Sequence, residues 1–226
     1  MSFPPAGGAY RLRFAPEDVD VRVDAVRGWF RERRREQFVW WIGPSATPSD
    51  LEARLLAGGA TRWEDGVITV MVTEQAPTEA PEVDVRRVER FEEFALAREI
   101  AWEVAEFTEQ QTAEYRATLR AKWEERARSG NGATYLAYVD GEAVASGDML
   151  FLPFCGFLSG ASTRPDYRGR GAFRALVHAR WDESVRRRTP ALVVGAGKMS
   201  RPILEQLGFR PVAEQHLLLD SSGLST

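Results

Sequence analysis

"TRPDYRGRGAFRAL", residues 163–176, lies between a strand-like run and an amphipathic helix. Gly169 and Gly171 allow the backbone to approach a ligand closely, and the start of the helix offers unpaired amides and the positive end of a dipole. The same letters occur in basic surface turns and in nucleic-acid-binding segments, but here the motif occurs once, between a strand and a helix. This order predicts a phosphate cradle whose natural occupant is a pyrophosphate-bearing cofactor.

The sequence around this motif predicts alternating strands and helices. Apolar residues alternate in the strands and recur at helical spacing in the helices, and Asp140-Gly141 is a strong hairpin signal. The predicted elements are a strand at 83–88, helices at 91–105 and around 115–129, strands at 133–139, 143–152 and 156–163, a helix at 171–188, a buried strand at 191–194, a helix up to Leu207 and a closing strand around 216–219. The strand, helix and strand from 156 to 194 predict a right-handed parallel crossover.

From about Val83 to about Asp220 the chain resembles the GCN5-related N-acetyltransferases. The family signature is Arg or Gln, two residues, Gly, one residue, then Gly or Ala, and Arg168 and Gly171 match it. Leu207-Gly208-Phe209 resembles the exit of the family's last helix. Phe173 departs from the signature, because the family has Gly or Ala there.

The resemblance implies an α/β fold with a mixed sheet, the acyl-CoA N-acyltransferase fold. It also implies an enzyme of class EC 2.3.1 that moves an acetyl group from acetyl-CoA to a primary amine by direct transfer in a ternary complex. No metal is implied. The residues implied to hold the cofactor are Ala161, Ser162, Thr163, Arg168, Gly169, Arg170, Gly171, Ala172, Phe173 and Arg174.

The catalytic residues depart from the family's pattern, because the family's frequent tyrosine acid is replaced by Leu204 and residues 158–161 lack the glutamate of many relatives. Asp148 on the neighbouring strand is the remaining candidate for the general base; the alternative is a solvent-side or bulge residue after Gly147. Ser200 is a candidate donor to the cofactor or its thiolate, and otherwise an N-cap. Water is an alternative proton source for the thiolate.

Residues 1–75 contain a partial internal repeat of the C-terminal half of this fold. Helix, buried strand, short helix, glycine and returning strand recur in the same order, but the segment before the first helix is acidic. We therefore expect a degenerate half-domain at 1–75 without a cofactor, a Pro-rich linker at 76–82 and an acetyltransferase-like domain at 83–226.

Composition narrows the function classes. The chain has 226 residues and a net charge of −3, which argues against bulk binding to nucleic acid. One cysteine, no signal-like start and no membrane-length apolar run favour a cytoplasmic protein without a membrane partner. The expected partner is a small-molecule or peptide amine, with monomer or homodimer left open. The alternative function is a non-catalytic or weakly catalytic acyl-CoA-binding regulatory module.

Overall fold

The computed structural model describes residues 7–78 and 81–221, which form two compact units. The larger unit contains Met71–Gly195 and Ser200–Arg210, and the smaller one contains the described residues up to Val70 together with 196–199 and 211–221. The units do not follow the expected boundary at 76–82, because the C-terminal strand pairs with a strand of the N-terminal segment. The shared ancestry of the two segments stays a prediction.

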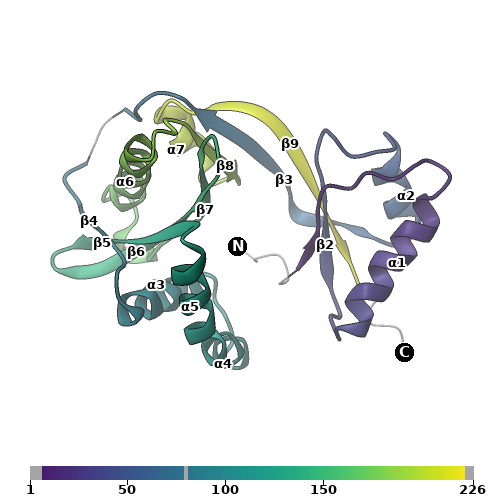
Figure 1. Cartoon of the computed structure of the whole chain (residues 1–226), viewed down its shortest axis with the longest axis horizontal. Coiled ribbons are helices and arrows are strands. Elements are labelled where there is room, and N and C mark those ends of the chain that lie inside the picture. The colour runs from purple at the N-terminus through teal and green to yellow at the C-terminus, as the bar shows by residue number, and fades with distance from the viewer. Residues whose placement is uncertain (1–6, 79–80, 222–226) are drawn as a thin grey trace. The chain divides into compact units, whose positions relative to one another are not determined.

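The larger unit is built on a mixed sheet in the order β8-β7-β6-β5-β4 (Figure 1). Its strands are β4 (Asp84–Arg87), β5 (Gly132–Val139), β6 (Glu142–Phe151), β7 (Gly156–Thr163) and β8 (Leu192–Ala196). Strands β5 to β7 form an antiparallel meander, β4 pairs antiparallel with β5, and β7 pairs in parallel with β8. Asp140 and Gly141 have φ values of 53° and 82°, as a two-residue hairpin turn with both φ positive requires. The predicted hairpin and parallel crossover are confirmed.

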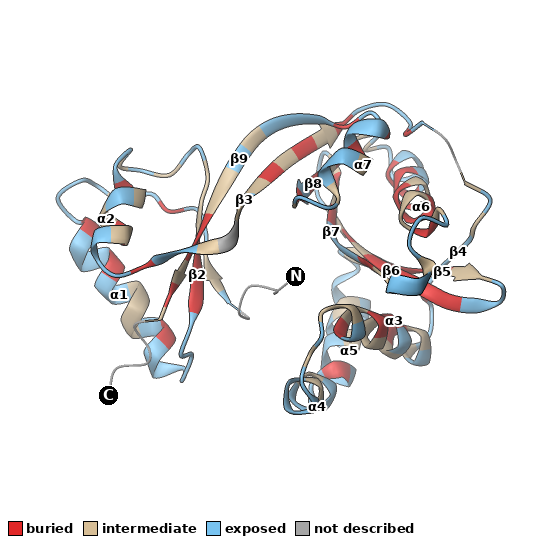
Figure 2. Ribbon diagram, turned by 180° about the vertical axis from the view of Figure 1, so that it is seen from behind, coloured by how far each residue is buried: buried red, intermediate tan, exposed pale blue. Residues whose placement is uncertain are grey.

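Helices cover both faces of this sheet, with α6 (Ala172–Arg186) on one face and α3 (Phe91–Val104) and α5 (Leu119–Ser129) on the other (Figure 1). The predicted second helix is divided into α4 (Glu109–Ala117) and α5, because the Thr118 hydroxyl donates to the carbonyl of Tyr115 and the chain bends there. A short helix, α7 (Arg201–Gln206), follows β8. The buried apolar residues form one cluster between the sheet and α3 and α5 and another between the sheet and α6, so the unit has two core layers. Figure 2 shows buried positions along the strands and on the helices of both faces.

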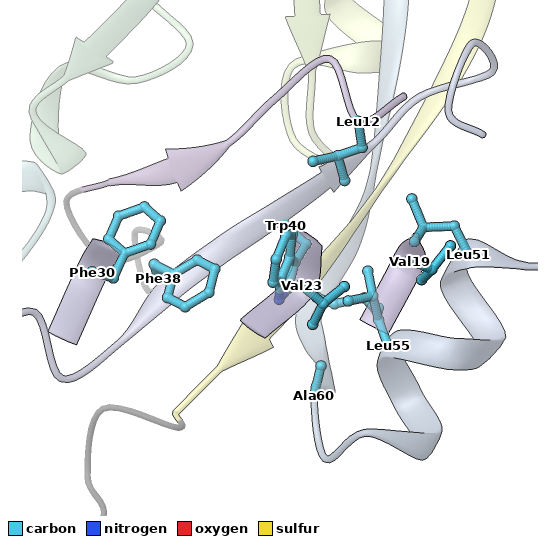
Figure 3. Packing of buried hydrophobic residues seen from close by; sticks show 10 residues of the cluster. Leu12, Val19, Val23, Phe30, Phe38, Trp40, Leu51, Leu55 and Ala60 are labelled. Atoms are coloured by element: carbon cyan, nitrogen blue, oxygen red, sulfur yellow. The ribbon is translucent and has the colours of Figure 1, made fainter. Parts of the chain in front are cut away.

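The smaller unit packs two helices against the strands β1-β2-β9-β3. Its elements are β1 (Gly8–Ala9), α1 (Val19–Glu32), β2 (Phe38–Ile42), α2 (Leu51–Ala57), β3 (Thr61–Thr73) and β9 (Arg210–Asp220), the last two also reaching into the larger unit. Strand β2 runs antiparallel to β9 in the register Phe38 to Asp220. The predicted order of helix, strand, short helix and returning strand is confirmed. The core of this unit is Leu12, Val19, Val23, Phe30, Phe38, Trp40, Leu51, Leu55, Ala60 and Leu218 (Figure 3).

Trp40 in this core also carries a polar contact. Its indole Nε1 donates to Oδ2 of the buried Asp220 at 2.8 Å, and Arg27 Nε donates to the same oxygen at 2.9 Å. Trp40→Phe keeps the aromatic packing but removes one buried donor, so we expect the free energy of unfolding to fall by about 1–3 kcal/mol. Urea unfolding measures this loss. The half-exposed Trp29 is the matched control, and an equal loss in Trp29→Phe would contradict the role of the hydrogen bond.

Within residues 7–78 and 81–221, every helix is too short or too polar to span a membrane.

Candidate active site

The predicted phosphate cradle is formed at the start of α6. Gly169 and Gly171 have φ values of 77° and 85°, so the two glycines take up left-handed backbone conformations in which side chains are strained. Gly171 is the N-cap of α6. The backbone amides from Gly169 to Phe173 donate to no backbone acceptor in the described chain. With the positive end of the α6 dipole, these amides form a concave set of donors suited to an anion.

The three arginines of the motif have different surroundings. Arg168 is exposed, donates from Nε to the carbonyl of Thr163 at 3.4 Å and forms no ion pair with a described residue. Arg170 is paired with Asp140 at 2.8 Å. Arg174 donates to the Gln206 side chain of α7, which ties the first turn of α6 to that helix. Unlike Arg170 and Arg174, Arg168 is therefore not tied to another side chain of the described residues.

Phe173, the departure from the family signature, lies half-buried in the first turn of α6. Its amide belongs to the unpaired set described above, so its side chain does not remove that donor.

Strand β7 has a free edge beyond Leu158. In the part of the chain that the structure describes, it pairs with β8 from Gly156 to Leu158 only, although β7 continues to Thr163. Residues 159–161 are exposed as a result. A strand that loses its neighbour in the middle of a sheet presents unpaired backbone groups to whatever lies beside it.

The register of β6 and β7 decides which amides face this free edge. Arg164 N donates to Val144 O, and in an antiparallel ladder hydrogen-bonded pairs alternate with pairs that face outward. Ser162 therefore bonds to Ser146 of β6, whereas the amides of Ala161 and Thr163 point away from β6. Of the three β7 residues predicted to hold the cofactor, two present their amides to the free edge.

A β-bulge lies beside these amides. Asp148 pairs with Gly160 and Met149 with Leu158, so Ser159 is the extra residue of β7. Gly160 has a φ of 151°, a conformation that favours glycine. The alternative that Asp148 adjoins a bulge is therefore what the register shows, with the extra residue on β7.

Asp148 points to the α3 and α5 face, where two arginines hold it. Arg98 Nη2 donates to its Oδ2 at 2.6 Å, Arg126 Nη1 donates to its Oδ1 at 3.0 Å, and Thr134 Oγ1 donates to Oδ1 at 2.7 Å. Burial raises the pKa of Asp148, but the attraction of the two guanidinium groups and the Thr134 hydrogen bond outweigh it, so the net pKa lies below its usual value. A carboxylate with a lowered pKa is a weak proton acceptor, which argues against the predicted role of Asp148 as general base, a role that a pH–rate profile would test.

The other candidates lie near α7. Ser200 occupies the N-cap position of α7, but its side chain makes no capping hydrogen bond there. Leu204, where many relatives carry tyrosine, is fully buried.

One residue at the bulge was not predicted from the sequence to belong to the site. Arg180 of α6 is 1% exposed and donates from Nη1 to the carbonyl oxygens of Asp148 and Gly160. The available signal was its position four residues after Leu176, in the apolar stripe of the helix, where a charged residue is unusual.

Comparison with known proteins adds an independent observation. A family model described as the acetyltransferase (GNAT) family matches residues 94–209, about half of the chain. No curated protein matches the sequence.

Solved structures share the fold over most of the chain. A GCN5-related N-acetyltransferase from Kribbella flavida has a TM-score of 0.67 at 18% identity, covering 94% of this chain and 80% of that one. A GCN5-related N-acetyltransferase from Sphaerobacter thermophilus has a TM-score of 0.63 at 19% identity, covering 92% and 69%. A tandem GNAT protein from the clavulanic acid biosynthesis pathway has a TM-score of 0.63 at 15% identity, covering 92% and 70%. At these identities the likeness concerns the fold, and it includes the N-terminal segment.

Proposed function

The chain belongs to the GNAT acetyltransferase family, and on this premise we propose that it transfers an acetyl group from acetyl-CoA to a primary amine by direct transfer in a ternary complex. The observation that carries the proposal is the continuity of two sets of unpaired donors. The amides from Gly169 to Phe173 start α6, and those of Ala161 and Thr163 lie along the free edge of β7 that leads into this loop.

The two sets of donors suit the two ends of the cofactor. The loop and Arg168 would hold the pyrophosphate, and the free edge of β7 would pair with the amide-bearing pantetheine arm in the manner of an added strand. Acetyl-CoA supplies the activated acetyl group as a thioester. Ala161 N–H would then lie beside the thioester carbonyl, where a backbone donor stabilises the negative charge that develops on oxygen.

The acceptor amine must be neutral to attack, and the charges near the bulge favour the neutral form. Arg98, Arg126 and Arg180 bring three guanidinium groups to the bulge, against the single carboxylate of Asp148. An excess of positive charge lowers the pKa of a bound ammonium. We infer that water, rather than Asp148, takes the proton, which an unchanged pH–rate profile in Asp148→Asn would support. Ser200 stays our candidate for donating to the departing thiolate.

Calorimetric titration with acetyl-CoA tests the cofactor site, with desulfo-CoA and ATP as comparison ligands. Release of free thiol in the presence of a panel of primary amines then tests turnover. The engaged carboxylate of Asp148 and the buried Leu204 favour a second candidate, a module that binds acyl-CoA without efficient transfer. Binding with thiol release supports the enzyme, binding without release supports the module, and no binding would contradict both.

Arg168→Ala is expected to weaken acetyl-CoA binding roughly tenfold or more, because a hydrogen bond to a charged group contributes about 1.5–3 kcal/mol. Calorimetry measures the change in dissociation constant. Arg128→Ala is the control, since Arg128 lies in the last turn of α5, outside the cradle, and pairs with Glu125. Equal affinities in wild type and Arg168→Ala would show that the loop does not hold the pyrophosphate.

A further inference from the structure

Arg180 lies on the α6 face of the sheet, directly above the β-bulge. Its Nη1 donates to Asp148 O at 3.1 Å and to Gly160 O at 3.2 Å, and its Nε donates to Leu176 O at 2.8 Å. The guanidinium covers Gly147, where an added Cβ would lie 3.1 Å from both Cζ and Nη1. The absence of a side chain at Gly147 is what allows a guanidinium to reach both strands of the bulge.

The charge of Arg180 is not neutralised by a contact. No carboxylate in residues 7–78 and 81–221 forms an ion pair with it, and its Nη2 has no hydrogen-bond partner there. The nearby Tyr135 hydroxyl is also buried and without a partner in the described chain. Burial lowers the pKa of Arg180 to about 10, so the group is still charged at neutral pH. An unpaired cation is costly to bury, and packing alone would be served by an apolar side chain.

One of the two Nη1 bonds, the one to Gly160 O, acts on a peptide unit that faces the proposed thioester. Gly160 C=O and Ala161 N–H belong to the same planar trans unit, in which the C=O and N–H point in opposite directions. The register places Ala161 N–H on the free edge of β7. Withdrawal of electron density from Gly160 O by a cation makes the N–H of that unit a stronger donor.

We propose that Arg180 is a positioning residue for acetyl transfer: it fixes the bulge and polarises the Gly160–Ala161 peptide unit, so that Ala161 N–H binds the thioester oxygen more strongly as negative charge develops. This inference rests on the proposed function. In the reaction the amine nitrogen forms a bond to the acetyl carbon while the C–S bond breaks. The sulfur leaves as thiolate, and the proton lost by the amine passes to solvent. Arg180 exchanges no proton and touches no substrate.

The carbonyl stretch of bound acetyl-CoA, labelled with ¹³C in the acetyl carbonyl, reports this polarisation without requiring the acceptor. In the wild-type protein the infrared band is expected to lie below its frequency in free acetyl-CoA. Arg180→Met fills the site without charge and is expected to lose more than half of that shift. Its affinity for acetyl-CoA should fall by roughly three- to tenfold, the value of one hydrogen bond, while its affinity for CoA, which has no acetyl carbonyl, stays unchanged.

Two further variants separate polarisation from general damage. Arg180→Lys keeps the charge but lacks the planar guanidinium, in which Nε bonds to Leu176 O while Nη1 bonds to both bulge carbonyls, so it should keep part of the shift. If Arg180→Met fails to fold, the reduced shift in Arg180→Lys decides. Arg186→Met is the control on the same helix, where Arg186 pairs with Glu183. An unchanged band in a folded Arg180 variant that binds acetyl-CoA overturns this inference alone. A wild-type protein that does not bind acetyl-CoA overturns the proposed function and this inference with it.

Discussion

Asp148→Ala is expected to lower the free energy of unfolding by about 3–5 kcal/mol, because it leaves two partly buried arginines without their counter-charge. The side chains of Asp148, Arg98 and Arg126 are 14%, 21% and 19% exposed, so water screens the pair little. The carboxylate also joins three elements, since Arg98 lies on α3, Arg126 on α5 and Asp148 on β6. Urea unfolding followed by circular dichroism measures the loss.

The exposed Asp182 on α6 is the matched control, and Asp182→Ala should leave the unfolding midpoint unchanged. Equal midpoints in wild type and Asp148→Ala would contradict a stabilising role for the cluster. Asp148→Asn should fall between them, because the amide keeps an acceptor for Thr134 but loses the charge.

The pH dependence of stability gives a second measurement on the same group. The pKa of Asp148 is lower in the folded chain than in the unfolded one, where it is about 3.9. Its contribution is therefore complete above the unfolded pKa and is lost as the pH falls through the lower folded pKa. As the pH falls from about 5 through the folded pKa, the free energy of unfolding should decrease more in wild type than in Asp148→Asn. Parallel pH profiles for the two proteins would contradict the lowered pKa.

Asp148 also shows where reasoning from the sequence ended. Its strand and its place beside the bulge follow from local signals, namely the hairpin at Asp140-Gly141 and the glycine at 147. Its partners do not, because Arg98 and Arg126 are 50 and 22 residues away in the chain and approach only when α3 and α5 pack on the sheet. A candidate base chosen from its position on a strand therefore proved to be an ion-paired carboxylate.

The order of strands and helices was largely predictable because it depends on local signals. Apolar periodicity, turn residues and the glycine-rich loop are local, and they located β4 to β8, α3 and α6. Pairing between distant segments does not follow from local signals. The pairing of β9 with β2, which groups β9 with the N-terminal residues, was therefore not predicted. The division at Thr118 was missed because a threonine inside a helical pattern carries no strong breaking signal.

The candidate site likewise contains parts that the sequence predicted and parts that it did not. The cradle at 168–174 was predicted from its residue types, because glycines and arginines before a helix favour anion binding. The free edge of β7 depends on how far β8 follows it, which no local pattern specifies. Arg180 combines both cases: its charge in an apolar stripe was visible, but its target, the bulge carbonyls, required the register of β6 and β7.

Gly171→Val is expected to weaken acetyl-CoA binding by at least about a hundredfold, equivalent to the loss of two hydrogen bonds to a charged group. Gly171 has a φ of 85°, which a β-branched residue strongly disfavours, and an added Cβ would lie 2.9 Å from Cβ of Pro81. The proline ring cannot swing aside as a flexible side chain would. The start of α6 must therefore shift, and the amides from Gly169 to Phe173 move with it. Calorimetric titration with acetyl-CoA measures the loss.

Gly141→Val separates this effect from simple backbone strain. Gly141 has a nearly equal φ of 82°, lies in the β5–β6 turn and has no atom within 4 Å of an added Cβ. This variant should lose stability through strain alone and keep its affinity for acetyl-CoA. Because the two glycines share a conformation and differ in their neighbours, a difference in affinity between the variants reflects the geometry of the cradle. If both variants bound acetyl-CoA as wild type does, the start of α6 would not be the pyrophosphate site.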